Sequence, residues 1–371
     1  MQIILPNDLK IRIGINFNRI VGPYGGGNLF VNNLEKYFRS RGHEVYRELV
    51  PELDLVLIVS SKPNIRTTSF KPQILTYYSA CYPEAVIVHR INTCDEQKAQ
   101  SQGINEIVLT VNKFADHTVF VSEFIRDLYT NQGFDVSKPH NAILTGVDEQ
   151  IFHADGRASW DGKEKIRIIT HHWSSNYLKG CDIYERLDLL LDRPPFKDLF
   201  EFTFVGNLPP GVSLKNTHYL PPLPAEEITV ILRDHHLYLT AARHEPGGNH
   251  YIEAMRCGLP VLYLKSGSSG EYCSAYGGVG YDLADFEMQL RSIPERLAEM
   301  REQVLACPFT ATRMAEQYEK LFIELVEARR KQTQPVRRNT FAIYKNRLLF
   351  KIRSKGLIQF KTRNDFEGDK I

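Results

Sequence analysis

The chain has 371 residues, of which 43% are hydrophobic and 24% are charged, and its formal net charge is +2. This composition excludes a disordered or low-complexity protein, and the length favours two domains over one. A net charge so close to zero gives no global electrostatic reason to expect nucleic-acid binding. The 6 cysteines are widely spaced without a C-x-x-C pair, a pattern typical of a reducing compartment.

The first stretch, "MQIILPNDLKIRIGINFN", lacks the basic, apolar and small-residue regions of a signal peptide. No apolar run approaches the roughly 18 residues of a membrane-spanning helix. We therefore expect a cytoplasmic protein, one that can also be peripheral to a membrane.

The first half of the chain alternates apolar runs with polar or helical stretches. Apolar residues at helical spacing predict a helix that begins near Leu29 and ends at Gly42. Short apolar runs predict strands at residues 11–17, 53–60, 73–80, 84–92 and 117–122. Alternating strands and helices favour a parallel sheet.

The pattern breaks into Gly, Asp and Lys near residues 150–163 and then restarts. Strands are predicted at residues 165–173, 200–207, 237–242 and 259–266, and helices at residues 178–191, 225–235 and 249–257. The fold class is therefore α/β, with a first unit at residues 1–155, a second at 156–325 and a tail at 326–371. Ligands of such sheets bind beyond the carboxyl ends of the strands, so a cleft between the units is the expected site.

The segment "HEPGGNHYIE" carries a candidate anion site. Gly247, Gly248 and Asn249 lie where a helix begins, and free N–H groups and the helix dipole there favour phosphate. Glu245 precedes the turn and Glu253 lies about five residues into the helix, and carboxylates suit the hydroxyl groups of a sugar or a ribose. A plain strand–turn–helix junction with solvated glutamates fits the same spacing.

This segment resembles the E-x7-E signature of the retaining family 4 glycosyltransferases (glycosyl transferases group 1). Ala254, Gly258, Pro260 and Val261 match the usual continuation of that signature, while Arg256 replaces its usual small residue. The resemblance implies the GT-B architecture, in which two Rossmann-like domains with parallel sheets face each other across a cleft. The first domain would lie on the acceptor side and the second would bind the nucleotide-sugar donor.

The resemblance covers residues 11–325. The motif "GPYGGGN", which contains Gly26 and Gly27, resembles the glycine-rich loop that approaches the diphosphate and the sugar. The segments "RGHEV", "VSEFIRDLY", "GVDEQIF" and "TFVGN" also resemble parts of the family's two domains.

The segment "SNYLKGCD" resembles the turn that holds the donor phosphates, and Lys179 matches the phosphate-binding lysine. The usual arginine five or six residues earlier is absent, because Trp173 and Ser174 stand there. Ser174 can donate one hydrogen bond. The helix N-terminus, Arg243 or a nearby histidine would then have to stabilise the leaving group.

The resemblance implies a front-face substitution that retains the anomeric configuration and needs neither a metal nor a cofactor. Glu245 would steady the sugar and Glu253 the ribose, while Lys179 and the amides of Gly247 and Gly248 would stabilise the diphosphate.

His89 in "VIVHRINTCDE" follows an apolar strand, where the family often places a histidine near the donor sugar. A histidine that closes the strand end by hydrogen bonding fits equally well. Arg90 and Asn92 are weaker candidates for the acceptor side.

Two adjacent pairs, His171–His172 and His235–His236, would point to opposite faces of a strand and chelate poorly. No H-E-x-x-H, C-x-x-C or D-x-D motif accompanies them. We therefore expect structural or surface roles for these histidines and no metal site.

Two segments admit more than one interpretation. The loop at residues 264–273, "LKSGSSGEYC", either donates backbone N–H groups to the donor or is a plain flexible loop. The tail interleaves basic with apolar residues, so it either packs on the first domain or contacts anionic lipid beside a lipid-linked acceptor. No nucleic-acid-binding module accompanies it.

The expected activity is transfer of a sugar from a nucleotide-sugar to a glycan, lipid-linked or other hydroxyl acceptor, in polysaccharide or glycoconjugate biosynthesis. Two alternatives remain: a GT-B-fold sugar-nucleotide epimerase, and a homologue that binds a nucleotide-sugar without turnover. Fold alone does not separate them.

Overall fold

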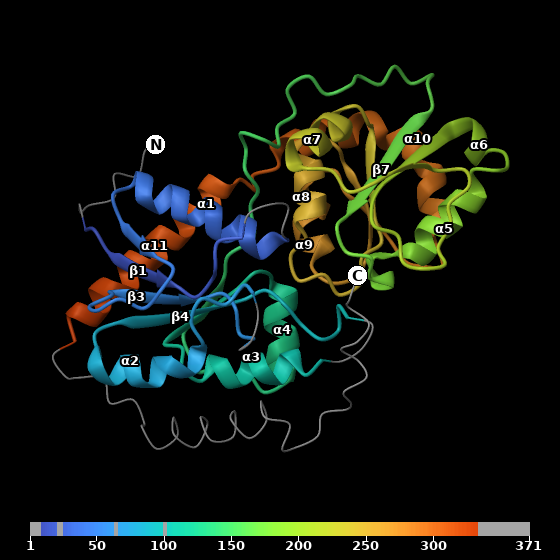
Figure 1. Ribbon diagram of the computed structural model, residues 1–371. Helices are drawn as coiled ribbons and strands as arrows, with labels where there is room; N and C mark the ends of the chain where they lie inside the picture. Colours follow the sequence, from blue (N-terminus) through green and yellow to red (C-terminus); the bar gives the residue numbers. More distant parts are fainter. Residues whose placement is uncertain (1–8, 21–24, 63–65, 99–101, 333–371) are drawn as a thin grey trace.

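The computed structural model describes residues 9–20, 25–62, 66–98 and 102–332. It contains two six-stranded sheets, and every strand pair in both sheets is parallel (Figure 1). Helices cover both faces of each sheet, so the α/β class expected from the sequence is confirmed.

The first sheet has the strand order β2-β1-β3-β4-β5-β6. Its strands and helices are β1 (Arg12–Ile15), α1 (Gly26–Ser40), β2 (Glu44–Tyr46), β3 (Leu55–Ile58), α2 (Leu75–Cys81), β4 (Val86–Ile91), α3 (Ile104–Asn112), β5 (His117–Phe120), α4 (Glu123–Asn131) and β6 (His140–Ala142).

Strand alternation divides the first core into two layers. Leu55 and Leu57 of β3 pack in the layer formed with α1, whereas Val56 and Ile58 pack in the layer formed with α2. All four of these side chains are fully buried. The sheet is therefore buried on both faces, as expected for parallel strands.

The second sheet has the order β12-β11-β10-β7-β8-β9. Its strands and helices are β7 (Ile166–His172), α5 (Cys181–Leu190), α6 (Phe196–Leu199), β8 (Phe200–Gly206), β9 (His218–Leu220), α7 (Ala225–Arg233), β10 (Leu237–Thr240), α8 (Asn249–Arg256), β11 (Val261–Leu264), α9 (Ser269–Cys273), β12 (Val279–Tyr281) and α10 (Phe286–Gln303).

The strand order of the second sheet is that of a doubly wound dinucleotide-binding fold. The order reverses between β7 and β10, and a ligand crevice is expected beyond the carboxyl ends of those two strands. Leu237 and Leu239 of β10 face the layer of α5 and α10, and Tyr238 faces the layer of α7 and α8.

One predicted strand is wrong. Residues 73–80 form a 3₁₀ turn (Pro72–Ile74) followed by α2, not a strand. Leu75 and Tyr78 are buried while Ile74 and Tyr77 are exposed, which is the three-residue spacing of a helix. The aromatic and β-branched composition concealed this periodicity, because it is typical of strands.

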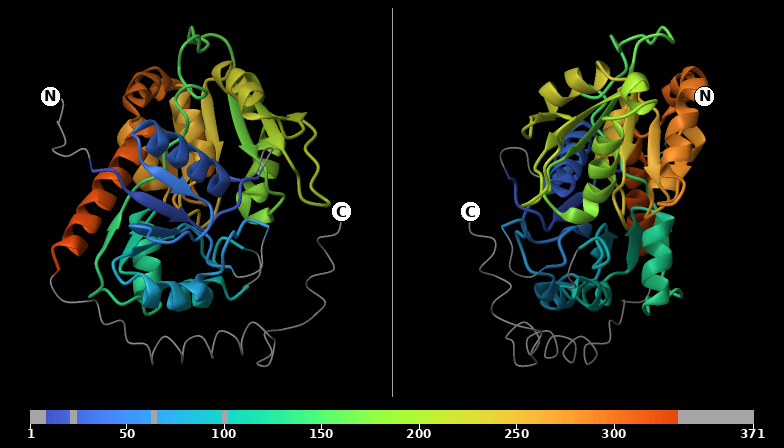
Figure 2. Two further views of the ribbon diagram at one scale, coloured as in Figure 1. Left: turned by 60° about the vertical axis from the view of Figure 1, so that its left-hand side comes forward. Right: turned by 90° about the vertical axis from the view of Figure 1, so that its right-hand side faces the viewer.

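The last described helix, α11 (Ala311–Arg330), returns to the first sheet (Figures 1 and 2). Tyr318, Phe322 and Val326 pack with α1 in the first core. Residues 311–325, which the sequence assigned to the second unit, therefore contribute to the core of the first.

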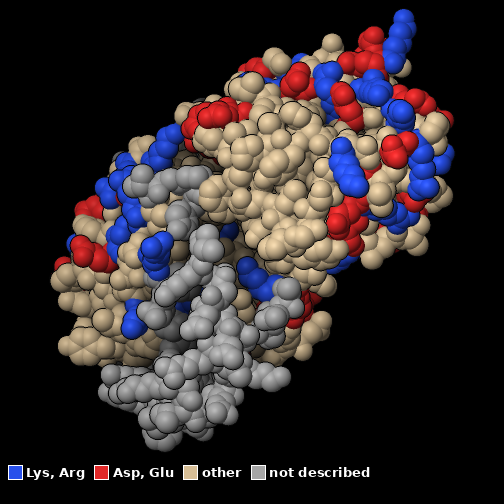
Figure 3. Space-filling view, turned by 45° about the vertical axis from the view of Figure 1, so that its right-hand side comes forward, with Lys and Arg blue, Asp and Glu red and all other residues tan. Residues whose placement is uncertain are grey.

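The predicted tail contact with a membrane concerns residues 333–371, which lie outside the described residues, as do residues 22–24 of the glycine-rich motif. Within the described ranges, no helix has both the length and the apolarity to cross a bilayer. Figure 3 shows Lys and Arg mixed with Asp and Glu around a wide uncharged area on one face of the second unit.

Candidate functional site

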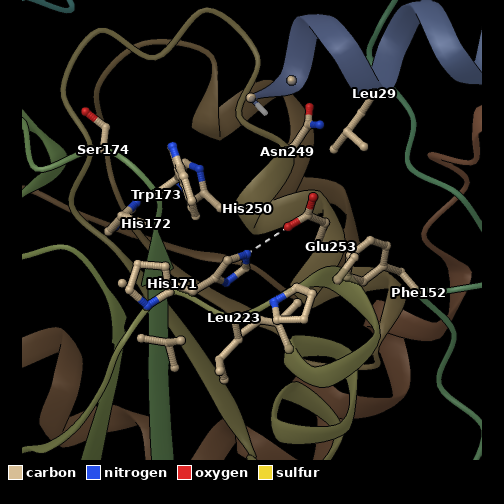
Figure 4. A pocket seen from close by; sticks show the side chains of 18 of the residues that line it. Leu29, Phe152, His171, His172, Trp173, Ser174, Leu223, Asn249, His250 and Glu253 are labelled. Carbon is tan, nitrogen blue, oxygen red and sulfur yellow. Dashed lines mark hydrogen bonds and ion pairs between the residues drawn. The ribbon is translucent and has the colours of Figure 1, made fainter. Parts of the chain in front are cut away.

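A cavity of about 680 Å³ is lined by residues of both units. Its walls come from the start of α1 and the end of β4 in the first unit, and from the ends of β7 and β8 and the start of α8 in the second. Figure 4 shows His171, at the end of β7, turned toward Glu253 of α8, with Leu29 of α1 near Asn249 and Glu253. The cavity thus occupies the crevice expected from the strand order.

Lys179 and Glu245 form an ion pair in the wall of this cavity. Their side chains are 22% and 12% exposed, so the pair is largely shielded from water. Gly180 places the lysine: its φ is +101°, and a Cβ there would lie 2.3 Å from the Cβ of Ala241. Only glycine fits this junction between Lys179 and α5.

The loop at residues 264–273 supports the backbone of Glu245. The Ser268 N–H and hydroxyl both donate to the Glu245 carbonyl, each at 2.9 Å, and the Ser266 hydroxyl accepts from the His244 N–H at 3.0 Å. This loop is not among the residues that line the cavity. In the structure the loop holds the Glu245 segment, and its direct contact with the donor stays a prediction.

Gly247 and Asn249 line the cavity at the start of α8, but Gly248 does not. The Gly248 N–H donates to the Tyr251 hydroxyl at 2.7 Å, so its amide is already engaged. A Cβ on Gly247 would lie 3.1 Å from the Tyr272 hydroxyl. This close approach favours glycine at the start of α8. Of the two glycines predicted to contact the diphosphate, Gly247 lines the cavity and Gly248 has its N–H engaged within the protein.

Glu253 also lines the cavity and is hydrogen-bonded to His171 (Figure 4). His171 Nε2 lies 2.7 Å from Glu253 Oε2, and no hydrogen-bond partner is present for the buried His171 Nδ1 among the described residues. The sequence prediction gave His171 only a structural or surface role. The imidazole instead orients the carboxylate that was predicted to bind ribose.

Three histidines, His171, His172 and His250, line the same part of the cavity. His172 and His250 have pKa values well below the usual histidine value, chiefly because burial disfavours their charged forms. His172 Nε2 lies 2.6 Å from the Tyr184 hydroxyl, and His250 Nε2 lies 3.1 Å from the Thr240 hydroxyl. These two rings therefore supply neutral polar groups at neutral pH.

Gly26 and Gly27 line the opposite wall at the start of α1. A Cβ on Gly26 would lie 3.3 Å from Oδ1 of Asn249, so the two units approach closely here. The glycine-rich motif and the E-x7-E segment were predicted to share a ligand, and the structure brings both into one cavity.

Arg90, and not His89, lines the cavity. His89 is fully buried: its Nε2 lies 2.9 Å from the Ser61 hydroxyl and its Nδ1 lies 3.2 Å from Asn112 Nδ2. Burial lowers the pKa of His89 to about 3. His89 is thus a hydrogen-bonded histidine within the sheet, and its contact with the donor sugar stays a prediction.

Of the remaining candidate residues, some line the cavity and one does not. Ser174 and Asn92 line the cavity. Arg243 does not, because both of its terminal nitrogens bind the carboxylate of Asp182, at 2.9 and 2.5 Å. Arg243 is thus no substitute for the missing phosphate-binding arginine.

An apolar part of the cavity was not predicted from the sequence. It is lined by Phe152, Pro222, Leu223 and Ile228, which come from loops and from α7. Their spacing in the sequence carries no common motif, so only the fold could bring them together.

Direct hydrogen bonds join the two units beside the cavity. The Ser122 hydroxyl, which caps α4, donates to the Pro246 carbonyl at 2.6 Å. The Glu271 carboxylate accepts from the first two N–H groups of α4, those of Glu123 and Phe124, at 2.8 and 2.7 Å. These bonds fix the E-x7-E segment relative to the first sheet.

Within the described ranges, no group of three or more His, Cys, Asp and Glu side chains is arranged to hold a metal ion. Neither His171–His172 nor His235–His236 forms part of such a group. His171 turns to Glu253 of α8 and His172 to Tyr184 of α5, so the adjacent rings do point to opposite faces.

No protein-family model matches this sequence, and no curated protein matches it significantly. Solved structures do match the fold. HepE of Anabaena, determined with UDP and glucose, has a TM-score of 0.63 and 15% identity, covering 84% of this chain and 99% of its own.

Sucrose-phosphate synthase of Thermosynechococcus elongatus has a TM-score of 0.59 and 16% identity, covering 86% of this chain and 100% of its own. The catalytic domain of starch synthase IV from Arabidopsis thaliana, determined with ADP and acarbose, has a TM-score of 0.61 and 13% identity, with coverages of 86% and 100%. At such identities the likeness establishes the fold. The chain has the GT-B architecture, with two Rossmann-like parallel sheets and a cavity between them.

Proposed function

We propose that this protein is a retaining glycosyltransferase that transfers a sugar from a nucleotide-sugar donor to a hydroxyl acceptor. The observation that carries the proposal is the ion pair of Lys179 and Glu245 beside the N-terminus of α8, within the cavity between the sheets. The alternatives, epimerisation and binding without turnover, have no comparable support from the site.

The phosphate part of the site follows from elementary electrostatics. Lys179 is a point charge that can turn from Glu245 to a diphosphate, and the first turn of α8 presents backbone N–H groups. Gly247 lines the cavity at that turn, so a phosphate can approach it there. Negative charge develops on the leaving diphosphate during transfer, so these groups act where the transition state needs them.

Glu245 and Glu253 serve the hydroxyl groups of the donor. Glu245, once its lysine partner binds phosphate, accepts hydrogen bonds from the sugar. Glu253 has one oxygen bound to His171 and another oxygen for a ribose hydroxyl. The neutral rings of His172 and His250 add polar contacts without adding charge.

The apolar part of the cavity suits a nucleobase, because base-sized ligands bind in apolar walls with a few polar groups. Neighbours of the same fold were determined with UDP, UDP-glucose or ADP, which supports a nucleotide-sugar as the ligand class. Neither a metal nor a cofactor is part of the proposed reaction, in keeping with the family that the sequence resembles.

Retention of the anomeric configuration can be tested by analysing the product of the transfer. We expect NMR of the product formed from a donor of known anomeric configuration to show the same configuration, with equal rates in EDTA and in added Mn²⁺. An inverted product would contradict the retaining mechanism, and loss of activity in EDTA would contradict the metal-free one.

The acceptor is proposed to be a glycan or a lipid-linked hydroxyl compound met by a cytoplasmic enzyme. The basic tail would bring the enzyme to a lipid-linked acceptor, since each basic residue near anionic lipid contributes about 1 kcal/mol. We expect the full chain, but not residues 1–332, to sediment with phosphatidylserine liposomes. Equal sedimentation of the two would contradict membrane contact by the tail.

A further inference from the structure

Arg90 faces the cavity because of its place in β4. Val86 and Val88 pack with α1 and α11, and Arg90 is the next residue on that face. Its guanidinium is buried, with its carbon 3.9 Å from the centroid of the Phe30 ring. The side chain is therefore held in place by packing and lines the cavity from the first unit.

The charge of Arg90 is not balanced within the described residues. Its buried Nη1 makes no hydrogen bond of normal geometry, its electrostatic partners are the neutral hydroxyl groups of Tyr318 and Tyr272, and no described carboxylate forms an ion pair with it. The other lining cation, Lys179, is paired with Glu245. An arginine side chain is effectively always protonated, and an unpaired buried charge is strongly unfavourable. Such a group is retained where a ligand brings the opposite charge.

Arg90 and the start of α8 line the same cavity. The Arg90 charge interacts electrostatically with the hydroxyl groups of Tyr318 in α11 and of Tyr272 in α9. The Tyr272 hydroxyl, in turn, lies 3.1 Å from where a Cβ on Gly247 would stand. A ligand in this cavity can therefore meet the guanidinium from the first unit and the N-terminus of α8 from the second.

We propose that Arg90 binds the diphosphate of the donor and takes the place of the phosphate-binding arginine whose position is occupied by Trp173 and Ser174. The inference rests on the proposed function, because it assumes a nucleoside diphosphate in the cavity. A guanidinium can bind two phosphate oxygens at once, which a lysine cannot do. In this chain, the second phosphate-binding cation comes from the first unit, so ligand binding depends on both units together.

The test compares Arg90→Met and Arg90→Lys with the wild-type chain. Calorimetry with UDP, ADP and GDP identifies the diphosphate that the wild type binds, and NMR titration measures the matching nucleoside. We expect Arg90→Met to bind the diphosphate about 10- to 100-fold more weakly, the range for a lost charge-assisted hydrogen bond. Nucleoside affinity should stay unchanged, and Arg90→Lys should recover part of the lost affinity.

Thermal melting without ligand separates this role from a structural one. Removing an unpaired buried charge should leave the melting temperature of Arg90→Met unchanged or higher. Arg291→Met is the matched control, because Arg291 stacks on Phe196 outside the cavity and its loss should not change diphosphate binding.

Several outcomes would overturn the inference. Diphosphate binding by Arg90→Met equal to that of the wild type would do so, as would an equal loss of nucleoside binding. A lower melting temperature with unchanged binding, or failure of Arg90→Met to fold, would show that Arg90 is a packing residue. If the wild type itself binds none of the three diphosphates, the proposed function fails together with the inference.

Discussion

Replacing Lys179 with methionine is expected to lower kcat for sugar transfer by about 10²- to 10³-fold, the usual cost of losing one group that stabilises a developing anion. Methionine keeps the length and the apolar stem of the lysine but not its charge. The leaving diphosphate would then depend on Arg90 and the N-terminus of α8 alone. Steady-state kinetics with the nucleotide-sugar that the wild type uses would measure the loss.

Lys265→Met is the matched control for that experiment. Lys265 also pairs with a carboxylate of the second unit, Asp282 at 2.8 Å, but it is half-exposed and lies outside the cavity. Its replacement should leave kcat within a factor of two, since exposed ion pairs contribute little, roughly 0–1 kcal/mol. Equal kcat values for Lys179→Met and the wild type would contradict the phosphate role of Lys179.

The second large effect is a loss of stability in mild acid. Burial lowers the pKa of His89 to about 3 and that of His235 to about 4, and it places the pKa values of His172 and His250 well below the usual value. In the unfolded chain the pKa values of all four lie near the ordinary histidine value of 6.5. The unfolded state therefore binds more protons below pH 6.5, and stability must fall as the pH falls.

Each of these histidines removes up to about 1.4 kcal/mol of unfolding free energy per pH unit once the pH is below 6.5. We expect urea unfolding to show a loss of several kcal/mol between pH 6.5 and 5. Carboxylates with lowered pKa values, such as Glu319, add to the loss of stability only near and below pH 4.5, the ordinary pKa of a glutamate. The interval from pH 6.5 to 5 thus reports the histidines.

His89→Gln and the exposed His218→Gln form a matched pair for this prediction. Glutamine keeps a hydrogen-bonding group near Ser61 but cannot bind a proton. The pH slope should therefore fall by about one proton in His89→Gln and stay unchanged in His218→Gln. A stability that is flat from pH 7.5 to 5 would contradict the neutral, buried state of these side chains.

Much of the second unit could be predicted because its signals are local. The spacing of Glu245 and Glu253 around a helix start, and Lys179 before a glycine, are short-range features that survive great divergence. The alternation of strands and helices likewise indicated two parallel sheets. These predictions needed no knowledge of which distant residues meet.

In β4 the residue that lines the cavity is Arg90, a weaker candidate in the sequence analysis, and not His89. β4 is buried on both faces, and all six of its residues are buried. Its hydrophobic pattern therefore cannot show which residues point to α1 and which to α3. A shift of one residue exchanges the faces, and that is the difference between His89 and Arg90.

Long-range packing accounts for the other differences. The periodicity of residues 311–330 predicts an apolar helix face but not the sheet that it covers, and α11 covers the first sheet. The bond between His171 and Glu253 joins residues 82 positions apart. Neither contact leaves a local trace in the sequence.

The central claim is that the cavity between the sheets binds a nucleotide-sugar through Lys179 and its neighbours. It is tested most directly by calorimetric titration of the wild type and Lys179→Met with UDP-, ADP- and GDP-sugars. We expect the wild type to bind one nucleotide class and Lys179→Met to bind it at least about tenfold more weakly, as for a lost charge-assisted hydrogen bond. Absence of binding to every donor, or equal affinity in the two proteins, would contradict it.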